Sequence, residues 1–136
     1  MNFFPYLNFN GNCKEAFEFY ARVLGGEIIV LSTFAEAPEE AGMPAEVGDQ
    51  VMHAQLKVGN QIFMASDAPK NFQPAQGFNI SIGVDTPEDA ERIYRALSEG
   101  GEVTMPLTET FWAQRFAVFT DRFGIPWMVN CDKPGQ

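Results

Sequence analysis

Two stretches that match each other decide the fold. Residues 12–27 read NCKEAFEFYARVLGGE, and residues 86–102 read TPEDAERIYRALSEGGE. Each stretch opens with a residue that can cap a helix, Asn12 or Thr86, followed three positions later by an acidic residue and then by apolar residues at helical spacing. Each closes with Gly-Gly-Glu, and glycine at this point stops a helix. The sequence therefore predicts two equivalent helices and an internal repeat.

The segments around both helices predict strands, one before each helix and three after it. They are rich in β-branched and aromatic residues and are bounded by turn residues. The predicted fold class is α+β, with two β-α-β-β-β modules near residues 3–67 and 78–131 in a single domain of residues 1–136, joined by a proline-containing linker at residues 68–77. The expected strands are residues 5–9, 27–34, 51–58 and 61–66 in the first half and 78–84, 102–107, 112–120 and 126–130 in the second.

Residues 35–50 form the other irregular stretch, and two interpretations of it stay open. Loops of this length are either functional lids or simply mobile. The acidic residues of the stretch are expected to be solvated, and they are Glu36, Glu39, Glu40, Glu46 and Asp49.

Composition and charge exclude several classes of partner. With 46% hydrophobic and 20% charged residues, the 136-residue chain is too apolar for disorder. Nine Lys and Arg against 18 Asp and Glu give a net charge of −9, which repels nucleic acid and anionic membranes.

The sequence has no apolar run long enough to span a bilayer and no signal-peptide pattern, so we expect a cytoplasmic protein. Cys13 and Cys131 have no metal-binding spacing and are expected to be buried thiols.

Short motifs along nearly the whole chain carry a family resemblance. They are Tyr6 to Gly11, Glu15-Ala16, Phe19-Tyr20, Leu24 to Glu27, Val51 to Ala54, Met64 to Asp67, Phe111-Trp112 with Arg115, and Asp121 to Trp127. In this order, and with the internal repeat, the sequence resembles the vicinal oxygen chelate superfamily of glyoxalase I, extradiol dioxygenases and bleomycin-resistance proteins, and within it the PhnB-like branch. The resemblance implies that two modules wrap into a cup with helices outside, and that chains pair as a homodimer.

The resemblance also bears on cofactors. Proteins of this branch are often described as ubiquinone-pathway methyltransferases, but no Gly-x-Gly-x-x-Gly follows any expected strand, so we do not expect methyltransferase activity.

The superfamily's four metal-ligand positions fall at or near Pro5 or Tyr6, Met64, Asn79 and Met128. None of these is His or a carboxylate, so no cofactor or catalytic metal is expected. A looser metal site of His53, Asp67 and a water is the alternative.

Strand parity predicts what lines the cup. On residues 51–58, the apolar set Met52, Ala54, Leu56 and Val58 suits packing under a helix, whereas His53, Gln55 and Lys57 point the other way. Such a mixture of amides, hydroxyls, thioethers and one imidazole suits an amphipathic small molecule, although the polar groups could instead satisfy each other and the methionines could fill the core. The remaining lining residues are Tyr6, Asn8, Met64, Ser66, Asn79, Ser81, Met128 and Asn130.

Individual roles follow from side-chain chemistry. His53 is the candidate catalytic residue, because histidine can take up or release a proton near neutral pH; the alternative is a histidine merely held by its neighbours. Trp112 is either an aromatic wall for a planar ligand or an ordinary core or interface residue. Arg115 is either a clamp for a carboxylate or phosphonate or part of a structural ion pair, which is the more expected. Asp67 and Asp121 are expected to form turns.

Two functions therefore remain from different classes. In the first, the protein binds and sequesters a small amphipathic molecule, as bleomycin-resistance proteins do, without chemistry. In the second, it is a lyase or isomerase in which His53 moves a proton on an enolisable small molecule. The missing metal ligands favour the first.

Overall fold

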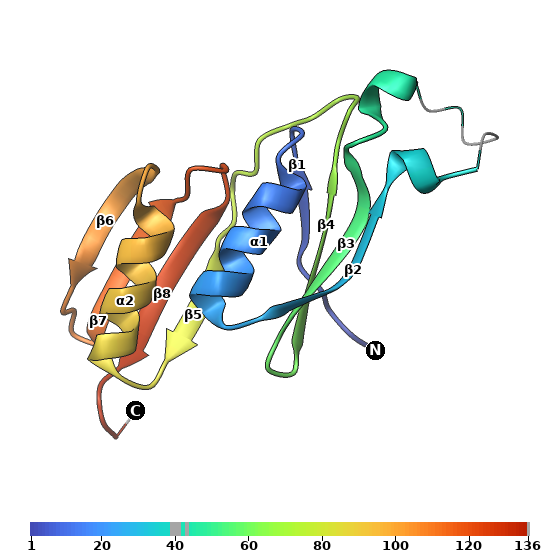
Figure 1. Cartoon of the computed structure of the whole chain (residues 1–136). Helices are drawn as coiled ribbons and strands as arrows, with labels where there is room; N and C mark the ends of the chain where they lie inside the picture. Colours follow the sequence, from blue (N-terminus) through green and yellow to red (C-terminus); the bar gives the residue numbers. More distant parts are fainter. Residues whose placement is uncertain (39–41, 43, 136) are drawn as a thin grey trace. The chain divides into compact units, whose positions relative to one another are not determined.

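The chain folds into two compact units of the same design (Figure 1). The computed structural model describes residues 1–38, 42 and 44–135, and the units are Met1–Pro74 and Ala75–Gln136. Within the described residues, each unit contains one α-helix and one open four-stranded sheet, in the order strand, α-helix, three strands. The predicted α+β class and the repeated β-α-β-β-β module are confirmed, while the cup remains a prediction.

The two sheets have the same topology. Unit 1 contains β1 (Tyr6–Phe9), α1 (Cys13–Leu24), β2 (Glu27–Thr33), β3 (Val51–Val58) and β4 (Gln61–Asp67), with the strand order β1-β4-β3-β2. Unit 2 contains β5 (Ile80–Val84), α2 (Pro87–Ser98), β6 (Glu102–Thr108), β7 (Ala113–Thr120) and β8 (Pro126–Asp132), with the order β5-β8-β7-β6. The first strand of each unit runs parallel to the last, and the other pairs are antiparallel. Residues 68–77 contain no helix or strand, as predicted.

The two helices begin in different ways. At α2, the side-chain oxygen of Thr86 accepts a hydrogen bond from the Asp89 amide at 3.1 Å, as predicted. At α1, the predicted Asn12 cap is wrong, because the Asn12 side chain makes no capping hydrogen bond. Instead, the Asp67 carboxylate accepts from the amides of Gly11, at 2.9 Å, and Cys13, at 3.0 Å. A carboxylate is the stronger acceptor at a helix N-terminus, and it comes from a strand more than 50 residues away.

The two glycines that follow each helix have different structural roles. Gly25 and Gly100 have φ angles of 72° and 77°, a conformation that favours glycine. A Cβ on Gly26 would lie 2.7 Å from the Lys57 carbonyl oxygen, and a Cβ on Gly101 would overlap the Thr120 carbonyl oxygen. The second glycine therefore lets the strand after the helix approach the backbone of its neighbouring strand.

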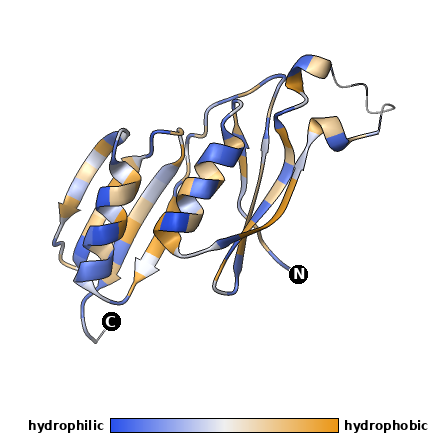
Figure 2. Ribbon diagram, in the orientation of Figure 1, coloured by the Kyte–Doolittle hydropathy of each residue, from blue (hydrophilic) through white to orange (hydrophobic). Residues whose placement is uncertain are grey.

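Each helix covers one face of its own sheet. Both helices carry many hydrophilic residues, whereas the strands mix hydrophobic and hydrophilic residues (Figure 2). The buried side chains under α1 include Leu7, Phe9, Phe17, Tyr20, Ala54, Leu56 and Ala65, and those under α2 include Ala90, Ile93, Leu97, Ala117, Phe119, Trp127 and Val129. Along β3, Val51 rather than Met52 is buried, because the register with β2 slips by one residue there. The prediction that Met52 packs under the helix is therefore wrong, whereas the same prediction for Ala54 and Leu56 is correct.

The stretch at residues 35–50 is closed at its base. The amide of Phe34 donates to the Gln50 carbonyl at 3.0 Å, and that of Ala35 donates to the Gly48 carbonyl at 3.1 Å. Two 3₁₀ turns, Phe34–Glu36 and Ala45–Val47, lie on either side. Glu39 and Glu40, which belong to the predicted lid or mobile loop, lie outside the described residues.

No helix in the described ranges is long and apolar enough to cross a membrane.

Candidate functional site

The helix-free face of the unit 1 sheet gathers most of the predicted site residues of the first half. Tyr6 stands opposite Met64, Asn8 opposite Ser66, and Gln55 opposite Met64. Residues directly opposed on neighbouring strands point to the same face, and the residues between them, such as Ala54 and Ala65, are buried on the helix side. We call this surface the His53 face, and it consists of Tyr6, Asn8, His53, Gln55, Met64 and Ser66.

The imidazole of His53 has a polar neighbour at each ring nitrogen. The Tyr6 hydroxyl lies 3.3 Å from Nδ1, and the Gln55 amide nitrogen lies 3.1 Å from Nε2. The rings of Tyr6 and His53 are stacked, with centroids 5.9 Å apart and planes inclined by 27°. Ser32, which the sequence analysis did not single out, stands opposite His53 on β2, and its hydroxyl donates to the His53 carbonyl at 3.4 Å.

These contacts determine which hydrogen bonds the ring can form. An amide nitrogen only donates, so Nε2 of a neutral His53 accepts from Gln55, and Nδ1 carries the proton and donates to the Tyr6 oxygen. A charged ring would need acceptors at both nitrogens. The Tyr6 oxygen already accepts a hydrogen bond from Nδ1. The Gln55 side chain would accept one from Nε2 if its amide group rotated to bring the oxygen toward the ring. Both neighbours can therefore serve either protonation state.

The helix-free face of the unit 2 sheet gathers the predicted residues of the second half. Ser81 stands opposite Met128 on β8. The Trp112 indole nitrogen donates to the Asn130 side-chain oxygen at 3.2 Å, and the Asn130 amide donates to an Asp132 carboxylate oxygen at 2.8 Å. The Trp112 ring also packs edge-on against Phe111 and Phe116, with centroid distances of 4.8 and 5.2 Å. The sequence analysis named Phe111 only as part of a motif and did not single out Phe116.

Of the remaining predicted ligand-binding residues, Asn79 lies just before β5, and Arg115 is not brought to this face. Asn79 precedes β5, and its side chain donates to the Trp127 carbonyl at 3.3 Å. Arg115 stands opposite Cys131, which is buried on the helix side, and its guanidinium donates to the Gln114 carbonyl at 2.7 Å. Among the described residues no carboxylate lies within ion-pair distance of Arg115, so the expected structural ion pair is wrong. Arg115 alternates in phase with the buried Ala117 and Phe119 along β7, so it belongs to the helix side of the sheet.

The two buried aspartates organise the backbone. Asp121 forms the predicted turn, accepting from the amides of Phe123 and Ile125 at 2.8 and 3.0 Å and from the Trp127 indole at 2.8 Å. Asp67 is not a turn former, which corrects the prediction. Besides holding the start of α1, it accepts from the Val51 amide at 2.8 Å, so one carboxylate ties β4 to the first residue of β3.

The superfamily's metal-ligand positions do not fit a divalent ion in this chain. Tyr6 and Met64 are register partners in unit 1, and Met128 pairs with Ser81 in unit 2. Phenol, thioether and amide groups are poor ligands for a hard or borderline dication. The alternative site fails as well, because Asp67 lies on the helix side of the sheet and His53 on the other. Across the described residues, no three His, Cys, Asp or Glu side chains converge as a metal site would require.

Both cysteines are buried thiols, as predicted. Burial, and secondarily the Asp67 charge, raises the pKa of Cys13 to about 12. Burial and then the charge of Asp132 raise the pKa of Cys131. Neither sulfur is an effective nucleophile or metal ligand near neutral pH, since both functions need the thiolate.

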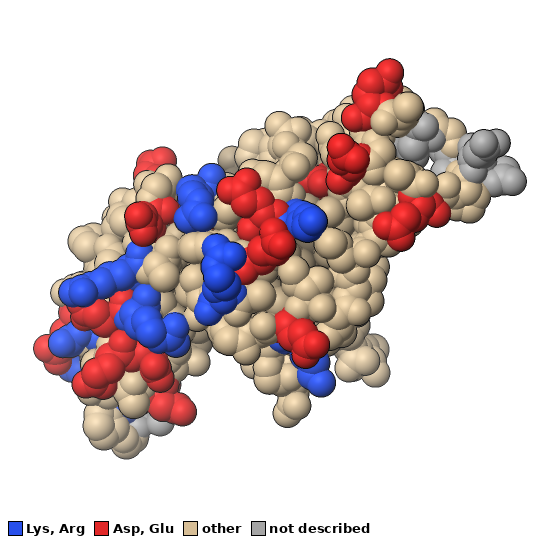
Figure 3. Space-filling model, viewed as in Figure 1, with Lys and Arg blue, Asp and Glu red and all other residues tan. Residues whose placement is uncertain are grey.

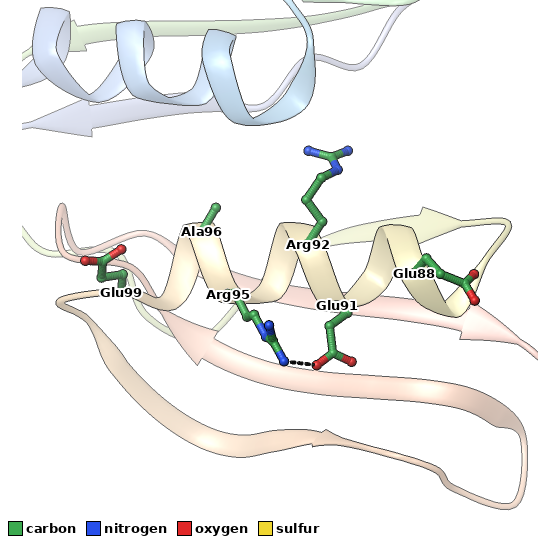
Figure 4. A pocket seen from close by; sticks show the side chains of 6 residues that line it. All are labelled: Glu88, Glu91, Arg92, Arg95, Ala96 and Glu99. Atoms are coloured by element: carbon green, nitrogen blue, oxygen red, sulfur yellow. Dashed lines mark hydrogen bonds and ion pairs between the residues drawn. The ribbon is translucent and has the colours of Figure 1, made fainter.

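A shallow depression on α2 is made of charged side chains and contains none of the predicted site residues (Figure 4). Its lining residues are Glu88, Glu91, Arg92, Arg95, Ala96 and Glu99. Arg95 pairs with Glu91 at 2.7 Å, and Arg92 pairs with Asp89 at 3.9 Å. Charges of both signs gather over this helix (Figure 3), and such exposed pairs are typical of a solvated helix surface.

The fold places the chain in a structural class. The two repeated modules with open four-stranded sheets form a glyoxalase-like α+β fold. A solved glyoxalase/bleomycin resistance protein/dioxygenase domain from Frankia sp. EAN1pec shares the fold with a TM-score of 0.66 at 14% identity, over 98% of each chain.

Within this class, the chain belongs to the PhnB-like family, whose family model, described as 3-demethylubiquinone-9 3-methyltransferase, matches residues 1–130. The chain is 47% identical to protein PA1353 from Pseudomonas aeruginosa, with a TM-score of 0.89 over 97% of this chain and 98% of that one. It is 36% identical to protein YjdN from Escherichia coli K12 over 95% of this chain and 94% of that protein. The PhnB protein from Bacillus cereus is 25% identical, with a TM-score of 0.82 over 96% and 99% of the two chains. The predicted resemblance is confirmed.

Proposed function

We propose that the protein binds a small amphipathic organic molecule against the His53 face and sequesters it without chemistry. The carrying observation is the set of groups around His53. The two ring nitrogens face a phenol and a carboxamide, and the Met64 thioether stands beside Gln55 in register. Apolar surface gives burial, and a few polar groups fix the orientation of a ligand.

The surroundings of the imidazole favour binding over catalysis. A histidine that acts as a general base is commonly oriented by a carboxylate, which stabilises the charged ring. No Asp or Glu within the described residues contacts the His53 ring, whose polar neighbours are Tyr6 and Gln55. The ring is therefore equipped to exchange hydrogen bonds with a ligand, and it lacks the partner that would strengthen it as a base.

One observation keeps an enzyme as the second candidate. The Tyr6 hydroxyl and the Gln55 amide can each donate or accept, so the ring can change protonation state without losing a hydrogen-bond partner. A lyase or isomerase acting on an enolisable small molecule needs this property.

We do not propose the methyltransferase activity that the family description carries. A methyl-donor nucleotide commonly binds at a glycine-rich loop between a strand and a helix. The loops at these points are Asn10-Gly11-Asn12 before α1 and Asp85-Thr86 before α2.

A screen of melting temperature against metabolites and metals identifies ligands, because a molecule that binds only the folded state raises the melting temperature. Each ligand found is then titrated into wild type and His53→Gln. For a binding protein we expect the variant to lose at most about 1–3 kcal/mol of affinity, the cost of one lost hydrogen bond. For an enzyme we expect turnover to fall about 100-fold or more.

The matched control is Glu18→Gln, which places the same side chain on the exposed surface of α1. Equal affinity of wild type and His53→Gln, with the melting temperature of the ligand-free variant strongly reduced, would contradict both candidate functions and make His53 a structural residue.

A further inference from the structure

Three aromatic rings gather at the turn between β6 and β7, and one of them is largely exposed. Phe111 is 86% exposed and packs edge-on against Trp112, which packs in the same way against Phe116. The turn is held by two hydrogen bonds of 3.0 Å, from the Thr110 amide to the Ala113 carbonyl and from the Ala113 amide to the Thr110 hydroxyl. A large aromatic ring that such a turn holds in water is a candidate binding group.

A chain of hydrogen bonds links the central ring of this group to a carboxylate. The Trp112 indole donates to the Asn130 side-chain oxygen at 3.2 Å, and the Asn130 amide donates to Asp132 Oδ1 at 2.8 Å. Asn130 also stands opposite Phe116 in the register of β7 with β8. Hydrogen bonds in series polarise one another, so the carboxylate makes the face of the indole ring more negative. We call Phe111, Trp112, Phe116, Asn130 and Asp132 the Trp112 cluster.

The negative charge of Asp132 is not neutralised by a neighbouring side chain. In the part of the chain that the structure describes, no Lys or Arg lies within ion-pair distance of it. Lys133, the next residue, pairs instead with Glu109 at 3.1 Å, and Arg115 donates to the Gln114 carbonyl at 2.7 Å. Unit 2 as a whole has nine acidic and five basic side chains. Its charge therefore attracts a positive ligand.

We propose that the Trp112 cluster binds a small organic cation of the quaternary ammonium class. The faces of Trp and Phe rings attract such a cation through their negative quadrupole, and the Asp132 carboxylate adds an opposite charge. A quaternary ammonium donates no hydrogen bonds, whereas a primary ammonium needs three acceptors, so aromatic ring faces suit the first better. The site lies wholly within unit 2 and does not rest on the function proposed for the His53 face.

The indole N–H signals of the two tryptophans supply the readout. In NMR spectra of ¹⁵N-labelled protein, Trp112 reports on the cluster, and the fully buried Trp127 is an internal control. The probes are choline and dimethylbutanol, in which a carbon atom replaces the choline nitrogen and removes its charge while keeping its shape. We expect choline to shift the Trp112 signal and not that of Trp127, and to bind about fivefold or more tightly than dimethylbutanol, the scale of a cation–π interaction.

Two variants test the ring and the carboxylate separately. Phe111→Leu keeps an apolar side chain but removes the exposed ring, and it should weaken choline binding about threefold. Asp132→Asn keeps an acceptor for Asn130 but removes the charge, and it should weaken choline binding about two- to fivefold. Neither should change the affinity for dimethylbutanol. The matched controls, which should bind choline as wild type does, are Phe3→Leu at an 89% exposed ring of unit 1 and Glu102→Gln at the opposite end of β6.

An unchanged Trp127 signal shows that each variant is folded. Equal affinity of wild type for choline and dimethylbutanol would make the Trp112 cluster an apolar surface only and would overturn the proposal. A Trp112 signal that choline does not move would overturn it too, as would choline affinity that both cluster variants retain. None of these results bears on the His53 face, because His53→Gln tests that face with its own ligands.

Discussion

Asp67 is the residue on which the arrangement of unit 1 most depends. Its two carboxylate oxygens accept three backbone hydrogen bonds, from Gly11, Cys13 and Val51, at 2.8–3.0 Å. The side chain is 3% exposed, so water does not replace a lost acceptor. The same residue therefore fixes the start of α1 and the start of the strand that carries His53.

Replacing Asp67 by Asn should lower the free energy of unfolding by about 1–3 kcal/mol, because one acceptor oxygen becomes an amide nitrogen and a buried donor loses its partner. Urea unfolding measures the change. Asp49→Asn makes the same chemical substitution at an exposed position and should have almost no effect. Equal stability of the two variants would show that the Asp67 hydrogen bonds contribute nothing.

The Cys13 thiol should make stability depend on alkaline pH. Its pKa rises from an ordinary 9.0 to about 12 in the folded protein, so between these values the unfolded chain releases a proton that the folded chain retains. The stabilisation is complete below about pH 9 and is lost as pH rises toward 12. We expect the unfolding free energy of wild type to fall more steeply from pH 8 to pH 10.5 than that of Cys13→Ala. Parallel curves would contradict the expectation.

The metal content of the purified protein follows from the side chains at Met64, Asn79 and Met128. We expect less than a tenth of an equivalent of Zn, Ni, Fe or Mn per chain after mild dialysis, measured by elemental analysis. About one equivalent of a single metal, or activity that is lost on chelation and restored by that metal, would overturn this expectation.

At the scale of the elements, the two Gly-Gly-Glu sequences support the same packing in both units. Gly26 and Gly101 stand where the strand after the helix meets the backbone of β3 or β7. Alanine at either position should destabilise the protein by about 1–3 kcal/mol, the usual cost of overpacking. Gly83→Ala is the control, since a Cβ at Gly83 meets no atom within 4 Å. Thermal unfolding of the three variants measures the difference, and equal melting temperatures would contradict the packing argument.

The helices and strands could be predicted from the sequence because the residues that start and stop each of them lie close together along the chain. Capping residues, helical spacing and the repeated glycines lie within a few residues of each other. All ten predicted helices and strands are present, with ends within two residues of the predicted ones. The Pro106 strand also formed, since β6 is an edge strand and tolerates a missing donor.

What local sequence did not predict depends on register and distant contacts. The Asp67 carboxylate displaces Asn12 as the cap of α1 from a position far along the chain. A one-residue slip of β3 against β2 buries Val51 in place of Met52. The alternation of apolar and polar residues along a strand does not reveal where the register shifts. It therefore placed His53, Gln55 and Met64 on the correct face and misplaced residues on the far side of a register shift.

At the scale of the whole molecule, we propose that the chain forms a homodimer. The edge strands β2 and β6 expose apolar side chains, with Ile29 at 45%, Val103 at 41% and Met105 at 40%. Open edges of this kind favour association. Light scattering coupled to size exclusion should give about 30 kDa, twice the chain mass of 15.1 kDa. Val103→Lys should shift the mass toward that of one chain, whereas a value near 15 kDa for wild type at high concentration would refute the dimer.

The parallel pairing of first and last strands has a consequence for synthesis on the ribosome. β1 lies at the edge of its sheet and, among the described strands, pairs only with β4; Met64 follows its partner Tyr6 by 58 residues. At about 5–20 residues per second, β1 waits roughly 3–12 s for its only hydrogen-bonding neighbour. During that interval α1 and β2 are complete but the sheet that α1 covers is not, so the apolar side of α1 is open to chaperones. A nascent chain arrested before β4 emerges should therefore be captured by a trigger-type chaperone, and one arrested well beyond Asp67 should escape it.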